Sequence, residues 1–170
     1  SRVIFYLSLF QAVESRARRP LSLETLADDL VKRAIRYGQR PPDISMGKAI
    51  SGAVGQYETL LEAIERLMSL SQARGILALR FEVVDDGLDR SRLIHGLDRG
   101  DLVLVTLGFG RETPAPSDFA DMIAEADSGF LSRATELGML RIVMHLSGGD
   151  LIVSRDRTSV ILVLPASPAG

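Results

Sequence analysis

Apolar residues recur in two long stretches of the chain with the 3.6-residue period of an amphipathic helix. The clearer stretch is 57–70, with apolar side chains at positions 57, 60, 61, 64, 67, 68 and 70 and neither Gly nor Pro inside it. Residues 130–146 form the second, ended by Gly148 and Gly149. Both stretches predict helices, and Ser117 and Asp118 are possible caps of a short helix that reaches Ala124.

The N-terminal part of the chain predicts two further helices. Residues 2–17 have helical composition and carry apolar side chains on nearly every face of the first two turns, so this helix needs neighbours on both sides. The stretch Val3 to Phe10 is therefore either core packing or the seam of a dimer. Ser22 is suited to cap a second helix, which Gly38 ends.

Short apolar runs between the helices predict strands. The runs at 76–84 and 101–108 flank a polar region and suggest an antiparallel pair. The runs at 151–154 and 159–165 are joined by the polar turn RDRT, and one short strand is expected at 44–46. Helices mixed with strands in this order favour an α/β two-layer sandwich, with helices on one face of a mostly antiparallel mixed sheet.

Composition and charge narrow the possible functions. Lys and Arg are spread along a chain of net charge -2, so we expect no nucleic-acid partner. The absence of cysteine excludes disulfides and thiol nucleophiles and fits a reducing cytoplasm. The longest apolar run, Val3 to Phe10, is far shorter than the roughly 20 residues that span a bilayer, so we expect no membrane contact in this segment.

The last forty residues carry the most specific motif. LGMLRIVMHLSGGDLIVSRDRTSVILVLP, residues 137–165, resembles the end of the ATP-binding domain of sensor histidine kinases, in the GHKL superfamily. In that family an amphipathic helix runs into Gly-Gly, a strand, a polar turn, a strand and Leu-Pro. The resemblance extends over residues 43–165 and implies a Bergerat-like fold. Residues 1–38 resemble the second helix and linker of the dimerisation module of HWE-type kinases, and imply a homodimer through the N-terminal helices.

The family's metal-binding and adenine-binding positions are altered in this chain. Alignment with the family puts Arg66 where an Asn binds magnesium, with Glu62 one turn earlier. An arginine has no lone pair for a cation, although it can contact a phosphate. The D-x-G-x-G loop becomes Thr106-Leu107-Gly108-Phe109-Gly110, which keeps both glycines and replaces the adenine-binding carboxylate by a hydroxyl. Asp85-Asp86-Gly87 competes for this assignment but lies too far from the C-terminal motif.

The glycine-rich lid of the family is also lost. Ala134 and Glu136 occupy its glycine positions, and Glu136 places negative charge where phosphates would lie. The resemblance therefore implies a degenerate, vestigial nucleotide site of Arg66, Thr106, Gly108 and Gly110. We expect no catalytic residue, no metal and no cofactor.

The remaining chemistry-bearing residues have ordinary explanations. His145 lies late in a helix, where the dipole favours a histidine, and His95 lies in a polar connection typical of surface residues. Glu62 and Glu65 suggest a paired-carboxylate site, but solvated helix charge is the usual reason for such spacing. Gly108 and Gly110 are either turn glycines or a relic of the nucleotide loop.

These features favour a cytoplasmic, non-catalytic protein of two-component signalling, dimeric, that docks a response regulator or another signalling protein. It resembles the stand-alone histidine phosphotransferases, although the helix that would present a phosphorylatable histidine is not visible. One alternative is a divergent sensor histidine kinase that still binds ATP and magnesium. Another is a structural dimerisation module at the end of a larger sensor.

Overall fold

The computed structural model describes residues 2–47, 52–71, 77–84, 88, 90–94, 96–97, 100–109, 133–153 and 159–167. Its elements in chain order are α1 (Arg2–Ser15), β1 (Arg19–Leu21), α2 (Leu23–Arg36), β2 (Asp43–Met46), β3 (Ala53–Gly55), α3 (Tyr57–Ser71), β4 (Leu77–Val84), the 3-10 turn η2 (Arg90–Arg92), β5 (Leu102–Phe109), α5 (Arg133–Leu146), β6 (Asp150–Val153) and β7 (Ser159–Pro165). The four long predicted helices and the five predicted strands are confirmed within this range. The short helix expected from Ser117 to Ala124 lies outside it.

The main sheet has five strands in the order β2-β4-β5-β7-β6. β2 pairs with β4 in parallel, and the other three pairings are antiparallel. The expectation of a mostly antiparallel mixed sheet is therefore confirmed. β1 and β3 form a separate two-stranded ribbon that the sequence did not predict, because three residues are too few to show a strand period.

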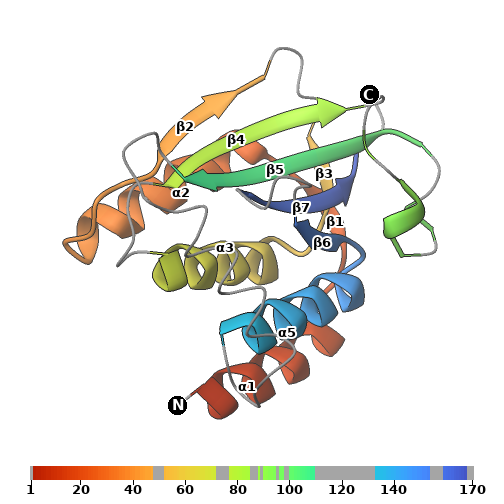
Figure 1. Ribbon diagram of the computed structural model, residues 1–170, viewed down its shortest axis with the longest axis horizontal. Helices are drawn as coiled ribbons and strands as arrows, with labels where there is room; N and C mark the ends of the chain where they lie inside the picture. The colour runs from red at the N-terminus through yellow and green to blue at the C-terminus, as the bar shows by residue number, and fades with distance from the viewer. Residues whose placement is uncertain are drawn as a thin grey trace.

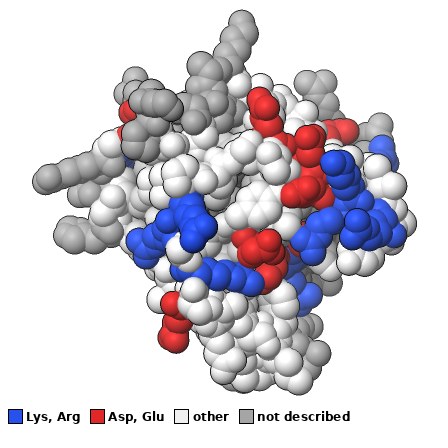
Figure 2. Space-filling view, turned by 180° about the vertical axis from the view of Figure 1, so that it is seen from behind, with Lys and Arg blue, Asp and Glu red and all other residues white. Residues whose placement is uncertain are grey.

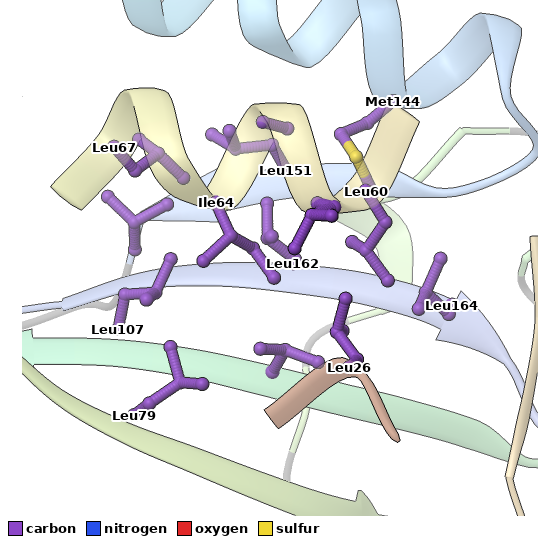
Figure 3. Close-up of a cluster of buried hydrophobic side chains, with 14 of the residues drawn as sticks. Leu26, Leu60, Ile64, Leu67, Leu79, Leu107, Met144, Leu151, Leu162 and Leu164 are labelled. Atoms are coloured by element: carbon purple, nitrogen blue, oxygen red, sulfur yellow. The ribbon is translucent and has the colours of Figure 1, made fainter. Parts of the chain in front are cut away.

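Helices α2, α3 and α5 cover one face of the sheet with a continuous apolar core (Figure 1). Leu60, Ile64 and Leu67 of α3 point towards the sheet residues Leu107 and Leu162 (Figure 3). A smaller cluster lies on the other face, where Leu102 and Leu104 of β5 pack with residues of β6 and β7 and of the segment before β5; its other members are Leu88, Leu93, Ile94, Leu97, Ile152, Ile161 and Val163. β5 is thus buried on both faces.

Helix α1 lies on the side of α5 and α3 that faces away from the sheet (Figure 1). Leu9 and Val13 pack against Val143 of α5, and Tyr6 joins the main core. Residues of both predicted ranges, 1–38 and 43–165, contribute to that core. The boundary between the ranges therefore separates segments of the sequence and not two hydrophobic cores.

The C-terminal end of α1 is held by side chains from two other elements. The Gln56 amide, just before α3, donates to the carbonyl oxygens of Val13 and Arg16, each at 3.0 Å. These are among the carbonyls that a helix end leaves without intrahelical partners. Arg18 then donates to the Leu146 carbonyl at the end of α5, at 3.3 Å. The connection from α1 to β1 is therefore fixed on both α3 and α5.

The Gly148-Gly149 pair between α5 and β6 is required by backbone conformation at Gly148 and by packing at Gly149. Gly148 has a φ of +96°, and a β-carbon there would lie 2.9 Å from Nε of Arg18. A β-carbon on Gly149 would lie 2.5 Å from the carbonyl oxygen of Val163 and 3.1 Å from the side chain of Leu164. These glycines let α5 turn directly onto the sheet.

Gly149→Ala is expected to destabilise the protein by about 1–3 kcal/mol, because backbone of β7 must move to admit the methyl group. The matched control is Gly138→Ala, within α5, where a β-carbon meets nothing within 4 Å. That substitution should stabilise the protein by about 0.5–1 kcal/mol through helix propensity. Urea unfolding of both variants measures the difference, and equal stabilities would contradict the packing role of Gly149.

Candidate functional site

Arg66, predicted at the magnesium-binding position, faces α1. Its guanidinium carbon lies 5.6 Å from the ring centroid of Phe5, a cation–π contact that joins α3 to α1. The residues of α3 that point at the sheet are Leu60, Ile64 and Leu67 instead. This contact of Arg66 with Phe5 lies on the side of α3 away from the sheet.

Thr106 and Gly108 lie on the opposite face of the sheet from α3. Successive side chains of a strand alternate between faces, and Val105 and Leu107 belong to the core under the helices. Thr106 must therefore point away from the helices, next to Arg80 of β4 and Ile161 of β7, its partners in register. Gly108 pairs with Ala78 and Ser159.

The structure does not bring Arg66 together with Thr106 and Gly108, because the sheet and its apolar core lie between them. Gly110, His95 and Asp85-Asp86-Gly87 lie outside the described residues, as do the side chains of Ala134 and Glu136. The predicted set of nucleotide-binding residues is thus split between two faces where it is described. The motif alone does not tell which residues of β5 face the helices, so the separation could not be predicted from it.

Glu62 and Glu65 each pair with an arginine from another element. Arg16 bonds to Glu62 at 3.0 Å and also to the Thr59 hydroxyl at 3.0 Å, while Arg33 of α2 lies 2.8 Å from Glu65. Burial raises the pKa of Glu65, and the nearby Arg33 charge opposes that rise. These carboxylates join helices and do not form a shared acid–base site.

A groove of about 470 Å³ lies where α1 ends and α2 and α3 begin. It is lined by Arg16, Ala17, Arg19, Pro20, Leu21, Ser22, Thr25, Gly55, Gln56, Tyr57 and Glu58. Its size is in the range of small-molecule sites. Of its two arginines, Arg16 is paired with Glu62, and Glu58 adds a negative charge to the lining. This mixture of charges does not favour the binding of nucleotide phosphates.

Charge on the back of the molecule is mixed. Figure 2 shows Lys and Arg side chains in separate groups with acidic side chains between them. A nucleic-acid surface would show one continuous basic area instead. Within the described residues, no group of three His, Cys, Asp or Glu side chains could hold a metal ion, and no helix there is long and apolar enough to cross a bilayer.

The most tightly organised polar cluster is centred on Asp150, the first residue of β6. Its side chain is fully buried and its Oδ1 accepts from Arg141 Nε at 3.0 Å and from the Leu151 amide at 2.7 Å. His145 Nε2 lies 2.6 Å from the same oxygen, and the Ile94 amide donates to Oδ2 at 3.1 Å. One carboxylate thus joins α5, β6 and the segment after η2.

The hydrogen bonds to Asp150 decide its ionisation. Burial alone would raise its pKa, but the bonds from Arg141, the Leu151 amide and His145 outweigh that effect and lower it. The carboxylate is therefore charged near neutral pH. The sequence predicts a helix-dipole position for His145 but not its pairing with Asp150, because the Gly148-Gly149 turn brings the two side chains together.

Asp150→Asn should lower the free energy of unfolding by about 1.5–3 kcal/mol at pH 7, because bonds to a charged acceptor are replaced by weaker ones. The folded-state pKa lies below the unfolded value of about 3.9. The charged group therefore stabilises the fold fully above that value, and its contribution disappears as pH falls through the folded pKa. Urea unfolding of both proteins between pH 7 and 3 should show the difference shrinking, and a constant difference would contradict this assignment.

Comparison with known proteins supports the fold of this chain and does not test its activity or its binding residues. No protein-family model and no curated protein matches the sequence. Among solved structures, the Acinetobacter baumannii histidine kinase AdeS has a TM-score of 0.55 at 12% identity, over 99% of this chain and 78% of that chain. The mycobacterial sensor histidine kinase MprB has a TM-score of 0.49 at 14% identity, over 89% and 99% of the two chains. The ATP-binding domain of PrrB from Mycobacterium tuberculosis has 0.46 at 16%, over 88% and 98%. The AdeS match shows that this chain has a histidine-kinase-like fold.

Proposed function

We propose that the protein is a non-catalytic, histidine-kinase-like component of two-component signalling, which dimerises through α1 and docks a response regulator or another signalling protein. The observation that carries the proposal is the separation of Arg66 from Thr106 and Gly108 by the sheet. The chain has a histidine-kinase-like fold, but Arg66 contacts Phe5 of α1 and Thr106 lies between Arg80 and Ile161 in the sheet. The likeness to histidine kinases supports the signalling context as an analogy of fold.

The residue types at these positions also disfavour ATP and magnesium. A guanidinium cannot ligate a cation, and Arg66 is already in contact with Phe5. The Thr106 hydroxyl is a neutral acceptor and weaker than the carboxylate of the family. Retention of ATP binding would need new contacts from elsewhere in the chain.

A dimer through α1 is supported by apolar side chains that are exposed to solvent in the monomer. Ile4 and Leu7 are 66% and 57% exposed, one turn apart on the same face of α1, and Val3 is beside them. Ile142 and Leu146, on the neighbouring helix α5, are also exposed. Clustered apolar side chains of this kind typically mark a protein contact.

Isothermal titration with ATP and magnesium tests the non-catalytic assignment. We expect no binding with a Kd tighter than about 100 μM, equivalent to roughly 5.5 kcal/mol. Tighter binding would support the divergent kinase instead. If tight binding occurs, Arg66→Ala tells whether Arg66 takes part, because loss of binding in this variant would show that its contact with Phe5 is exchanged for a phosphate.

The double variant Ile4→Glu/Leu7→Glu should convert a dimer to a monomer, because four charges would be buried at a two-fold interface. Light scattering after size-exclusion chromatography measures the mass. The control is Ile35→Glu on α2, which changes a side chain that is 63% exposed away from this face and should remain dimeric. A monomeric parent protein, or a dimer that survives the double variant, would contradict dimerisation through α1.

Docking is measured separately, by surface plasmon resonance with purified receiver domains of response regulators. Saturable binding to one of them is the result that the proposal expects. A stable dimer that binds none would favour the structural dimerisation module.

A further inference from the structure

His145 and Asp150 form a close side-chain pair where α5 leads into β6. His145 Nε2 lies 2.6 Å from Asp150 Oδ1, and the imidazole is 31% exposed while the carboxylate is fully buried. Among the described residues, Nδ1 of this ring has no hydrogen-bond partner. Nε2 is therefore bound to a buried carboxylate, while the side chain that carries Nδ1 is partly exposed to solvent.

The carboxylate that holds the ring is itself fixed. Arg141 and the Leu151 amide bond to Oδ1, and the Ile94 amide bonds to Oδ2. An ionised carboxylate on Nε2 selects the tautomer with its proton on Nε2 and its lone pair on Nδ1. The nucleophilic form of the imidazole is thus the favoured one.

The charges beside the ring offset each other. Asp150 carries one negative charge, which Arg141 neutralises at 3.0 Å. Arg92 accepts from Arg141 with its backbone carbonyl, while its guanidinium donates to the Val153 carbonyl at the end of β6, three residues beyond Asp150. Among these described residues, no net negative charge therefore opposes an anionic reactant at His145.

We propose that His145 is a phosphoryl-acceptor site, modified on Nδ1 by an acyl phosphate, with Asp150 as its positioning residue. The inference rests on the proposed function and deepens it, because the phosphorylated aspartate of a response regulator is an acyl phosphate. It also supplies the acceptor histidine that the sequence failed to place in the N-terminal helices.

The reaction balances without a further reactant. The Nδ1 lone pair attacks phosphorus and forms the N–P bond, while the P–O bond to the acyl group breaks and its electron pair leaves with the carboxylate. The proton on Nε2 stays in place, donated to Asp150. The charge of Asp150 then stabilises the positively charged ring of the phosphohistidine.

The test uses the full chain and radiolabelled acetyl phosphate, a small acyl phosphate that needs no partner. We expect one acid-labile, alkali-stable phosphoryl group per chain, and tandem mass spectrometry of the parent protein should place it on His145. His145→Gln should lose the label, whereas His95→Gln should keep it, since His95 is the only other histidine. Mapping in the parent protein keeps the test valid even if a variant fails to fold.

Asp150→Asn tests the positioning role. Labelling should slow by about tenfold or more, because the asparagine no longer selects the nucleophilic tautomer. Nitrogen-15 NMR of the imidazole should show the lone pair shifting from Nδ1 towards Nε2 in this variant. A ring tautomer unchanged by the substitution would show that Asp150 acts only in packing and would overturn this part of the proposal.

Absence of label, or label on His95 or on a carboxylate, would overturn the phosphoryl-acceptor assignment. Such a result would leave the proposed docking function standing, because receiver-domain binding is measured without any phosphate donor. Conversely, labelling of His145 without receiver-domain binding would contradict the docking function and leave the acceptor site intact.

Discussion

Strand β5 is buried on both faces, and its neighbours in the sheet and the helices above it are arranged around it. Val103, Val105 and Leu107 pack under the helices, while Leu102 and Leu104 pack against the other cluster. A shift of one residue would exchange the two sets, so the phase of this strand is strongly specified. The same phase places Thr106 on the face of the sheet away from α3, and therefore apart from Arg66. Under the proposed function, this packing disfavours a shared nucleotide site as much as the exchanged side chains do.

Helix α1 is tied to this framework by polar contacts that complement its apolar packing. Gln56 satisfies carbonyl groups at the end of α1, Arg16 reaches Thr59 and Glu62 on α3, and Arg18 reaches the end of α5. The orientation of α1 is therefore set by the same helices that cover the sheet. Its remaining exposed apolar face is held in one direction, which is favourable for a contact because little ordering is needed on binding.

Much of the fold could be predicted from the sequence, because it depends on local periodicity and caps. The helix at 57–70 and the Ser22 cap, whose hydroxyl oxygen accepts from the Thr25 amide at 3.2 Å, are examples. The site was harder to predict, because it depends on which face each strand residue occupies and on contacts between distant segments. The sequence correctly predicts that Thr106 lies in a strand. The face on which it lies depends on core packing, which the motif does not indicate. His145 and Asp150 are only five residues apart, yet their pairing depends on the turn at Gly148-Gly149, and the bond from Ile94 comes from a segment more than fifty residues away.

The proposed function and the proposed acceptor site involve two surfaces of the described residues, the apolar face of α1 and the polar cluster at Asp150. Both lie on a histidine-kinase-like framework. Under the proposed function, Arg66, Thr106 and Gly108 do not bind one nucleotide together. Paramagnetic relaxation of amide resonances by manganese-loaded ATP measures this residue by residue. No selective broadening of the three amides is expected, and their joint broadening at micromolar ligand would contradict the proposed function.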